Sequence, residues 1–157
     1  MKKLLVEVVV IVLLASTFGV ARNLLFPNSI SLAPSDEPIL DIGAKQIDLE
    51  QAKRMFEEGV VFLDARGCPY YTAGHIAGAR CLKPSEYEEK KADVLAGVAK
   101  DQPLVTYCDG KECSSSVLLA EKLLEDGYTN VYVYPNGWNE WREAGLPIEK
   151  GIMGGGW

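Results

Sequence analysis

The feature that most constrains this chain is a regular alternation of short apolar runs with longer helix-like stretches. The short runs are rich in β-branched or aromatic residues and occupy residues 60–63, 103–107 and 130–134. The stretches with helical spacing of apolar residues, or with polar residues spaced for a solvated helix, occupy residues 49–58, 85–96, 114–125 and 138–144. This order predicts an α/β fold, in which a mostly parallel sheet is covered by helices on both faces.

Some of these elements can be specified further from their residues. Residues 47–49 are a candidate for a short edge strand before the first helix. The polar stretch 85–96 predicts a solvated helix. The stretch 114–125 predicts a helix with a buried stripe made of Val117, Leu118, Ala120, Leu123 and Leu124.

The N-terminus has the pattern of a membrane signal or anchor. Lys2 and Lys3 precede an apolar run from Leu4 to Ala21, which has about the length needed to cross a bilayer as a helix. The positive charge before the run favours an N-inside orientation. We therefore predict a signal-anchor or transmembrane segment at residues 1–25, with the following domain on the extracytoplasmic, periplasmic side.

Cleavage after the small residues Gly19-Val20-Ala21 is the alternative, and it would leave a secreted or periplasmic protein. Residues 26–38 contain three prolines and no apolar periodicity, which predicts an exposed linker. The folded domain is expected at residues 39–150, and a Gly-rich tail follows at 151–157.

Charge and cysteine content exclude several classes of protein. The formal net charge of −6 makes nucleic acid an unfavourable partner. The chain has four cysteines, but none of them forms a CxxC pair of the kind that thioredoxin-like enzymes and zinc ribbons use. No metal or organic cofactor is therefore expected. Cys68 and Cys81 remain able to pair as a disulfide in an oxidising compartment.

Cys108 is the leading candidate for a nucleophile. It directly follows the apolar run 103–107, and the short loop after it leads into the predicted helix at 114–125. Backbone amides and the positive end of a helix converge in such loops, so we expect the pKa of the Cys108 thiol to be lowered. The same cradle would suit a persulfide or a phosphoryl oxyanion. A cysteine phosphatase needs an arginine where this chain has Ser114, which favours sulfur transfer.

Several ordered motifs resemble the rhodanese family. They are Asp64-Ala65-Arg66, residues 71–79 (YTAGHIAGA), residues 105–108 (VTYC), residues 124–131 (LEDGYTNV), residues 137–141 (GWNEW) and Gly145-Leu146-Pro147. The resemblance covers roughly Ile47 to Pro147 and implies a five-stranded parallel sheet flanked by helices. The form YC-x-G-x-x-C at residues 107–113 looks like a membrane-anchored bacterial branch of that family.

The resemblance also implies roles for individual residues. Cys108 would carry a persulfide, and the loop after it would cradle that group with the residues Asp109, Gly110, Lys111, Glu112, Cys113 and Ser114. We expect Asp64 and Arg66 to form a local charge pair, and the resemblance makes His75 a structural hydrogen-bonding residue.

Two positions depart from the family pattern: Tyr70 stands where the family often has Glu, and Cys113 where it often has Arg. Lys111 is then the only cation in the loop, so attraction for the thiosulfate dianion should be weak, and the donor could instead be a polysulfide or a protein persulfide.

These observations lead to one main functional hypothesis and two alternatives. The main hypothesis is a sulfurtransferase in which Cys108 takes sulfane sulfur from a small donor and passes it to a thiol or other nucleophilic acceptor. The first alternative is a sulfur-binding or redox module in which Cys108 and Cys113 cycle between dithiol and disulfide without turnover. The second is a catalytically silent interaction domain on a membrane stalk.

Overall fold

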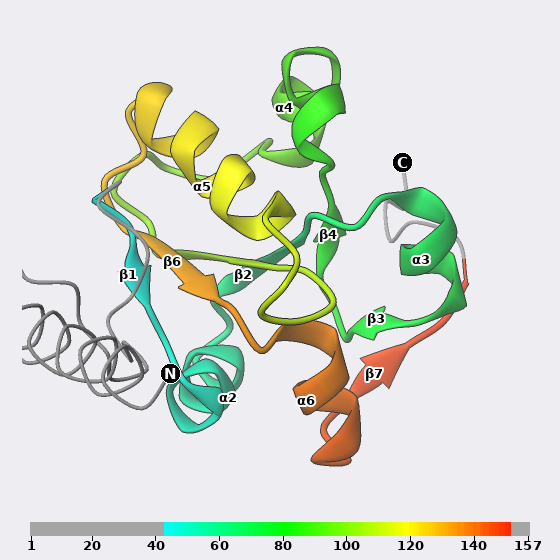
Figure 1. The fold of residues 1–157 in the computed structure, drawn as a ribbon. Coiled ribbons are helices and arrows are strands. Elements are labelled where there is room, and N and C mark those ends of the chain that lie inside the picture. Colours follow the sequence, from blue (N-terminus) through cyan, green and yellow to red (C-terminus); the bar gives the residue numbers. More distant parts are fainter. Residues whose placement is uncertain (1–42, 152–157) are drawn as a thin grey trace, which may run out of the picture. The chain divides into compact units, whose positions relative to one another are not determined.

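A five-stranded parallel sheet lies at the centre of residues 43–151, the part of the chain that the computed structural model describes (Figure 1). The strand order is β1-β6-β5-β2-β4, and each neighbouring pair is parallel. The strands are β1 (Lys45–Gln46), β2 (Val61–Asp64), β4 (Arg80–Cys81), β5 (Leu104–Tyr107) and β6 (Val131–Tyr134). The predicted mostly parallel five-stranded sheet is confirmed.

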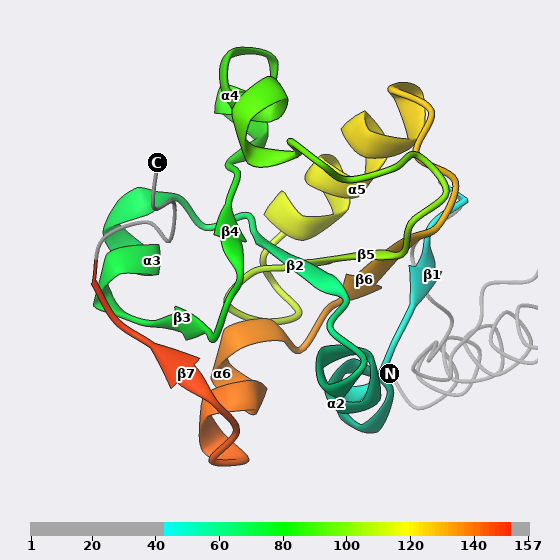
Figure 2. The same cartoon turned by 180° about the vertical axis from the view of Figure 1, so that it is seen from behind.

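Helices cover both faces of this sheet, as predicted (Figures 1 and 2). α4 and α5 lie over one face, and α2 and α6 lie over the other. The helices are α2 (Leu49–Glu57), α3 (Cys68–Ala73), α4 (Tyr87–Val94), α5 (Ser115–Glu125) and α6 (Gly137–Glu143), with a short 3-10 turn at Pro84–Glu86. A separate antiparallel pair joins β3 (His75–Ile76) to β7 (Ile148–Glu149).

The alternation of side chains along the strands divides the core into two clusters. Leu63 and Leu104 face α5, where they pack with Leu119 and Leu123. On the opposite face the largest member is Trp141, which is fully buried among aromatic rings of α2, β2 and β6. Each cluster buries apolar area on one side of the sheet, so both faces contribute to stability.

Strand β5 lies in the middle of the sheet and is buried along its whole length. It pairs with β2 on one side and with β6 on the other. A strand covered on both faces is expected to be apolar throughout, and LVTY at 104–107 nearly is. Because Cys108 is the next residue, the sheet delivers it to the carboxyl edge of its central strand.

The predicted edge strand at 47–49 is wrong by a few residues. Lys45–Gln46 form β1, while Asp48 is the N-cap of α2 and Leu49 is its first residue. The side chain of Asp48 accepts from the Gln51 amide at 2.8 Å, and the Gln51 side chain accepts from the Asp48 amide at 2.9 Å. This capping box competes successfully with extension of the strand.

Two helix predictions also need correction. In α5 the predicted residues Ala120 and Leu123 are buried, and Val117 and Leu124 are partly buried against the same core. Leu118 is wrong, because it is 46% exposed, and the adjacent Leu119 is buried instead. The stretch at 85–96 is not wholly solvated, because Tyr87 is buried and its hydroxyl donates to Asp126 at 3.0 Å. The elements α3, β3, β4 and β7 were not predicted, and Cys68 is the first residue of α3.

The predicted N-terminal hydrophobic helix at 1–25, the linker at 26–38 and nearly all of the tail at 151–157 lie outside the described residues. Among residues 43–151, no helix combines the length and the apolar character needed to span a bilayer.

Candidate active site

Cys108 is fully buried at the point where β5 gives way to the loop 109–114. The hydroxyl of Thr106, in the same strand, donates to the carbonyl oxygen of Ser116 at 2.9 Å, which fixes the first turn of α5 beside the strand. Within the loop, the Cys113 amide donates to the Gly110 carbonyl at 2.9 Å and closes a turn. The loop is therefore held at both ends and in its middle.

The thiol of Cys108 is held in its protonated form. Its Sγ donates to the carbonyl oxygen of Cys113 at 2.9 Å and lies 3.5 Å from the hydroxyl of Ser116. Burial, followed by the neighbouring Cys113 thiol, raises the pKa of Cys108 to about 11, although the hydroxyl and amide of Ser116 act in the opposite direction. The prediction of a lowered pKa for Cys108 is wrong for this structure, because carbonyl oxygens take the place expected for amides.

The converging amides surround Cys113 instead. Burial opposes ionisation of its thiol, but interactions with the Cys108 thiol, with the amide and hydroxyl of Ser115 and with the amide of Asp109 together lower the pKa of Cys113. A thiolate is stabilised by such donors. Cys113 is thus the more readily ionised of the two loop cysteines.

This arrangement limits how Cys108 can react. A Cys108 thiolate would lie 2.9 Å from the Cys113 carbonyl oxygen, and the negative sulfur and the partly negative oxygen would repel each other. Nucleophilic attack by Cys108 would therefore require that this carbonyl turn away, so that loop amides replace it beside the sulfur.

The remaining loop residues point away from the cysteine or support the loop. Lys111, Glu112 and Ser114 are exposed, and among the described residues their side chains have no hydrogen bond or ion pair. Gly110 lies against α6, where a Cβ added to it would come within 3.7 Å of the Asn139 amide nitrogen. Asp109 is bound by a residue from a different loop, which links the two segments.

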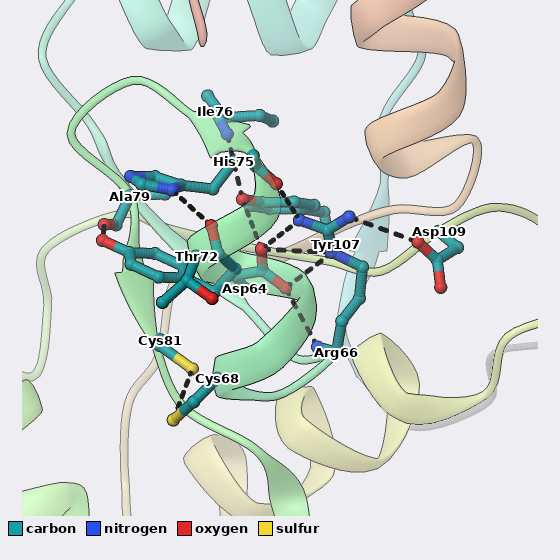
Figure 3. Close-up of polar contacts among 12 residues, drawn as sticks. Asp64, Arg66, Cys68, Thr72, His75, Ile76, Ala79, Cys81, Tyr107 and Asp109 are labelled. Carbon is teal, nitrogen blue, oxygen red and sulfur yellow. Dashed lines mark hydrogen bonds and ion pairs between the residues drawn. The ribbon is translucent and has the colours of Figure 1, made fainter. Parts of the chain in front are cut away.

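That residue is Arg66, which bridges the buried Asp64 to the cysteine loop (Figure 3). Its Nη2 donates to Asp64 at 2.6 Å and to the Gly74 carbonyl at 2.7 Å, while Nη1 donates to Asp109 at 3.2 Å. The hydroxyl of Tyr107 also donates to Asp64, at 2.9 Å. The expected charge pair between Asp64 and Arg66 is present, and the buried carboxylate has four donors around it.

Arg66 stays charged in this network. Burial works against its charge, but the hydrogen bonds and the negative charge of Asp64, with smaller contributions from Tyr107 and Asp109, raise its pKa above the ordinary arginine value. The guanidinium also lies over the ring of Trp138, 4.8 Å from its centroid. Arg66 is therefore a fixed cation that positions Asp109.

His75 belongs to a second, adjoining group of contacts. Its Nδ1 lies 2.8 Å from the carbonyl oxygen of Tyr71, and its ring stacks on that of Tyr71 with a centroid distance of 3.6 Å. The Tyr71 hydroxyl donates to the Ala79 carbonyl at 2.7 Å, closing the turn that carries β3. The described contacts of His75 do not include Cys108, as a Cys–His hydrolase would need.

The start of α6 contacts the cysteine backbone directly. The Trp138 amide donates to the Cys108 carbonyl at 2.7 Å, and the Asn139 amide donates to the Asp109 carbonyl at 3.0 Å. At Gly137, where φ is +55°, a Cβ would overlap the Cys108 carbonyl oxygen. No site role was predicted for Gly137 or Ser116. Gly137 could have been noticed because it directly precedes the predicted helix at 138–144. The sequence around Ser116 contains no comparable signal.

The other two cysteines form a separate pair. The Sγ atoms of Cys68 and Cys81 lie 3.7 Å apart, and both residues are thiols here. No cluster of three or more His, Cys, Asp or Glu side chains able to hold a metal occurs among residues 43–151.

The fold and site together define an α/β domain whose cysteine follows the central parallel strand and precedes a loop and a helix. A model of the rhodanese-like domain matches residues 48–144. The chain therefore belongs to the rhodanese-like domain family.

Characterised relatives agree with this assignment. The chain is 33% identical to a thiosulfate sulfurtransferase GlpE of Pseudomonas fluorescens, over 62% of this chain and 84% of the relative. It is 35% identical to the protein of the same name from Pseudomonas putida, over 67% and 90%. In fold it is similar to the polysulfide-sulfur transferase homodimer of Wolinella succinogenes, with a TM-score of 0.56, 20% identity, and coverage of 69% and 80%. Sulfur transfer is thus the activity of its relatives at the level of the family.

Proposed function

We propose that the chain is a sulfurtransferase that carries sulfane sulfur as a persulfide on Cys108. The observation that carries the proposal is the position of Cys108 at the end of the central strand, in a chain whose relatives include thiosulfate sulfurtransferases. In the proposed cycle the Cys108 thiolate attacks the outer sulfur of a donor, and the donor leaves with its electron pair. A thiol or other nucleophilic acceptor then removes that sulfur from the cysteine.

We propose that the donor is a polysulfide or a persulfide rather than thiosulfate. Within the loop only Lys111 is cationic, and it lies between Asp109 and Glu112, while Arg66 is already neutralised by Asp64 and Asp109. A compact dianion such as thiosulfate gains little by approaching such a loop, whereas a longer polysulfide keeps its second charge farther from the loop and a persulfide carries no second charge on its sulfurs. Thiosulfate turnover is expected to be weak relative to polysulfide turnover.

Intact mass spectrometry tests the proposal. The purified protein is incubated with polysulfide or thiosulfate, and a cyanide-labile gain of about 32 Da, one sulfur atom, is expected. The gain should disappear in Cys108→Ser and persist in Cys113→Ser. A sulfur adduct that survives in Cys108→Ser would refute the proposal.

A second candidate function is a dithiol–disulfide module formed by Cys108 and Cys113, and the lowered pKa of Cys113 favours it. In that case the same experiment gives a loss of about 2 Da, abolished by either substitution. The effect of Cys113→Ser separates the two functions, because the sulfur adduct survives this substitution and the loss of two hydrogens does not.

We also propose that residues 1–25 anchor the domain on the extracytoplasmic side of a membrane. The basic start and the apolar run at 4–21 support this location. Protease accessibility in spheroplasts, combined with N-terminal sequencing of the mature protein, distinguishes an anchored domain from a cleaved, released one. Protection of the domain from added protease in spheroplasts would contradict both versions.

A further inference from the structure

A groove of about 380 Å³ adjoins the cysteine loop, on the side where α3, α6 and β7 meet. Its lining residues are Arg66, Tyr70, Ala73, Gly74, Asp109, Trp138, Asn139, Arg142, Ile148 and Lys150. Two of them, Trp138 and Asn139, donate through their backbone amides to the carbonyls of Cys108 and Asp109. The groove therefore contacts the backbone of the cysteine loop, and Asp109, the residue after Cys108, forms part of its wall.

The groove is positively charged, whereas the protein as a whole is negatively charged. Arg66 and Asp109 are paired with each other, which leaves Arg142 and Lys150 as the cations available to a ligand. Neither of these two side chains has an ion pair or hydrogen bond within the described part of the chain. The whole sequence carries −6, so a small anion is repelled by most of the surface and attracted here.

The groove also exposes apolar surface. Tyr70 is 60% exposed and Ile148 is 41% exposed, and they are two of the three large hydrophobic residues left exposed among residues 43–151. Trp138 adds an aromatic ring to the wall of the groove. Such a mixture of aromatic and cationic side chains fits a ligand with both a carboxylate and an apolar portion.

We propose that this groove binds the sulfur acceptor, and that the acceptor is a small thiol carrying at least one carboxylate. The inference rests on the proposed function of Cys108. It assigns the groove to the acceptor rather than the donor, because thiosulfate and polysulfides are smaller and have no organic portion to contact Tyr70 and Ile148.

The acceptor, held through its carboxylate by Arg142 and Lys150, attacks the outer sulfur of the Cys108 persulfide with its thiolate. A bond forms between the acceptor sulfur and the outer sulfur, and the bond from the outer sulfur to Cys108 Sγ breaks. The electron pair of that bond stays on Cys108, which takes up the proton that the acceptor thiol lost. The acceptor leaves as a persulfide.

The test compares two thiols that differ in charge. Persulfide-loaded protein is mixed with glutathione, which carries two carboxylates, or with neutral 2-mercaptoethanol, and loss of the added sulfur is followed by intact mass. The double variant R142Q/K150Q should lower the second-order rate with glutathione by about tenfold, with the loss confined to the anionic thiol. Raising the salt concentration should slow only the reaction of glutathione with the unaltered groove.

The matched control is K53Q/R54Q, which removes the same charge from α2, outside the groove. It should react with glutathione at the rate of the unaltered protein. An equal loss in this control, an equal loss with 2-mercaptoethanol, or no loss in R142Q/K150Q would overturn the inference while leaving sulfur transfer intact. Failure of Cys108 to take up sulfur at all would overturn the proposed function, and the inference with it.

Discussion

Gly137 is the residue at which α6 comes closest to the cysteine loop. Its φ of +55° and the overlap that a Cβ would make with the Cys108 carbonyl oxygen both require glycine. We expect Gly137→Ala to lower the free energy of unfolding by about 2–4 kcal/mol and to reduce sulfur loading of Cys108, since the loop backbone must move. Urea unfolding and the mass assay measure the two effects.

Gly127→Ala is the matched control for this substitution. Gly127 also has a positive φ, +87°, but a Cβ there would meet nothing within 4 Å. Gly127→Ala should lower the free energy of unfolding by only about 1 kcal/mol and leave the sulfur loading of Cys108 unchanged. Equal behaviour of the two variants would mean that the close approach at Gly137 has no role beyond backbone conformation.

The reactivity of the two loop cysteines should depend on pH in different ways. Because burial raises the pKa of Cys108 to about 11, its thiolate is scarce at neutral pH, and its alkylation rate should rise about tenfold per pH unit until that pKa is approached. Cys113, with its lowered pKa, should be alkylated first at neutral pH. Peptide-resolved mass spectrometry after iodoacetamide treatment measures both rates. Faster labelling of Cys108 than of Cys113 at pH 7 would contradict the structure.

Among the helices, α5 carries the core residue that the sequence pattern missed. Leu119 is fully buried and packs in the same cluster as Leu63 and Leu104, whereas Leu118 is 46% exposed. Leu119→Ala should therefore destabilise the domain by about 2–5 kcal/mol, and Leu118→Ala by less than about 1 kcal/mol. Chemical unfolding of the two variants provides the comparison. A larger loss of stability in Leu118→Ala than in Leu119→Ala would favour the buried position predicted from the sequence.

Helix α3 and strand β4 meet at the Cys68–Cys81 pair (Figure 3). The sulfurs lie 3.7 Å apart, so small side-chain rotations should bring them to bonding distance when a disulfide oxidant such as oxidised glutathione is added. The product should have lost about 2 Da and gained up to about 3 kcal/mol of stability, the value for a loop of this size. Either Cys68→Ser or Cys81→Ser abolishes closure. A lasting glutathione adduct in the unaltered protein would show that the pair does not close.

The elements differ in how far their sequences predicted them. The strands β2, β5 and β6 and the helix α5 were predicted to within a residue or so, because each buries a continuous or periodic apolar pattern. β3, β4 and β7 have two residues each, which is too short for any periodicity, and β7 exists only because it pairs with β3 across the chain. The end of β1 was misplaced because Asp48 caps the helix that follows.

The place of Cys108 at a strand end was predicted, but the protonation of its thiol was not. The position of Cys108 and the charge pair of Asp64 with Arg66 follow from local order in the sequence. The direction of the Cys108 pKa shift depends on whether loop carbonyls or amides face the sulfur, and residue types do not determine that direction. The groove was also not predictable, since its walls come from segments about 80 residues apart.

For the molecule as a whole, alkaline pH should be destabilising. Burial raises the pKa of Cys108 to about 11 and that of Cys81 to about 12, and it also raises the pKa of Tyr107. The unfolded chain releases these protons from about pH 8.5 for thiols and about pH 10 for tyrosine, so above about pH 8.5 it binds fewer protons than the folded chain. The free energy of unfolding must therefore fall as pH rises through this window.

Urea unfolding at pH 7, 9 and 10 measures this decline. Each such group contributes up to about 1.4 kcal/mol per pH unit above its unfolded pKa. Between pH 9 and 10, Cys108→Ala should reduce the decline in the free energy of unfolding by up to about 1.4 kcal/mol, the contribution of one thiol. Cys113→Ala should not reduce it. A flat stability profile from pH 8 to 10 would contradict the protonated, buried state of these groups.

The placement of Cys108 directly after β5 also affects how the molecule opens. β5 is hydrogen-bonded to a strand on each side and buried on both faces, so its amides should be among the slowest in the protein to exchange with deuterated water. The loop amides that follow are tied by few backbone bonds and should exchange through small local fluctuations. Chemistry at Cys108 then depends on motions of the loop alone, and it can proceed while the strand that anchors the sulfur stays closed.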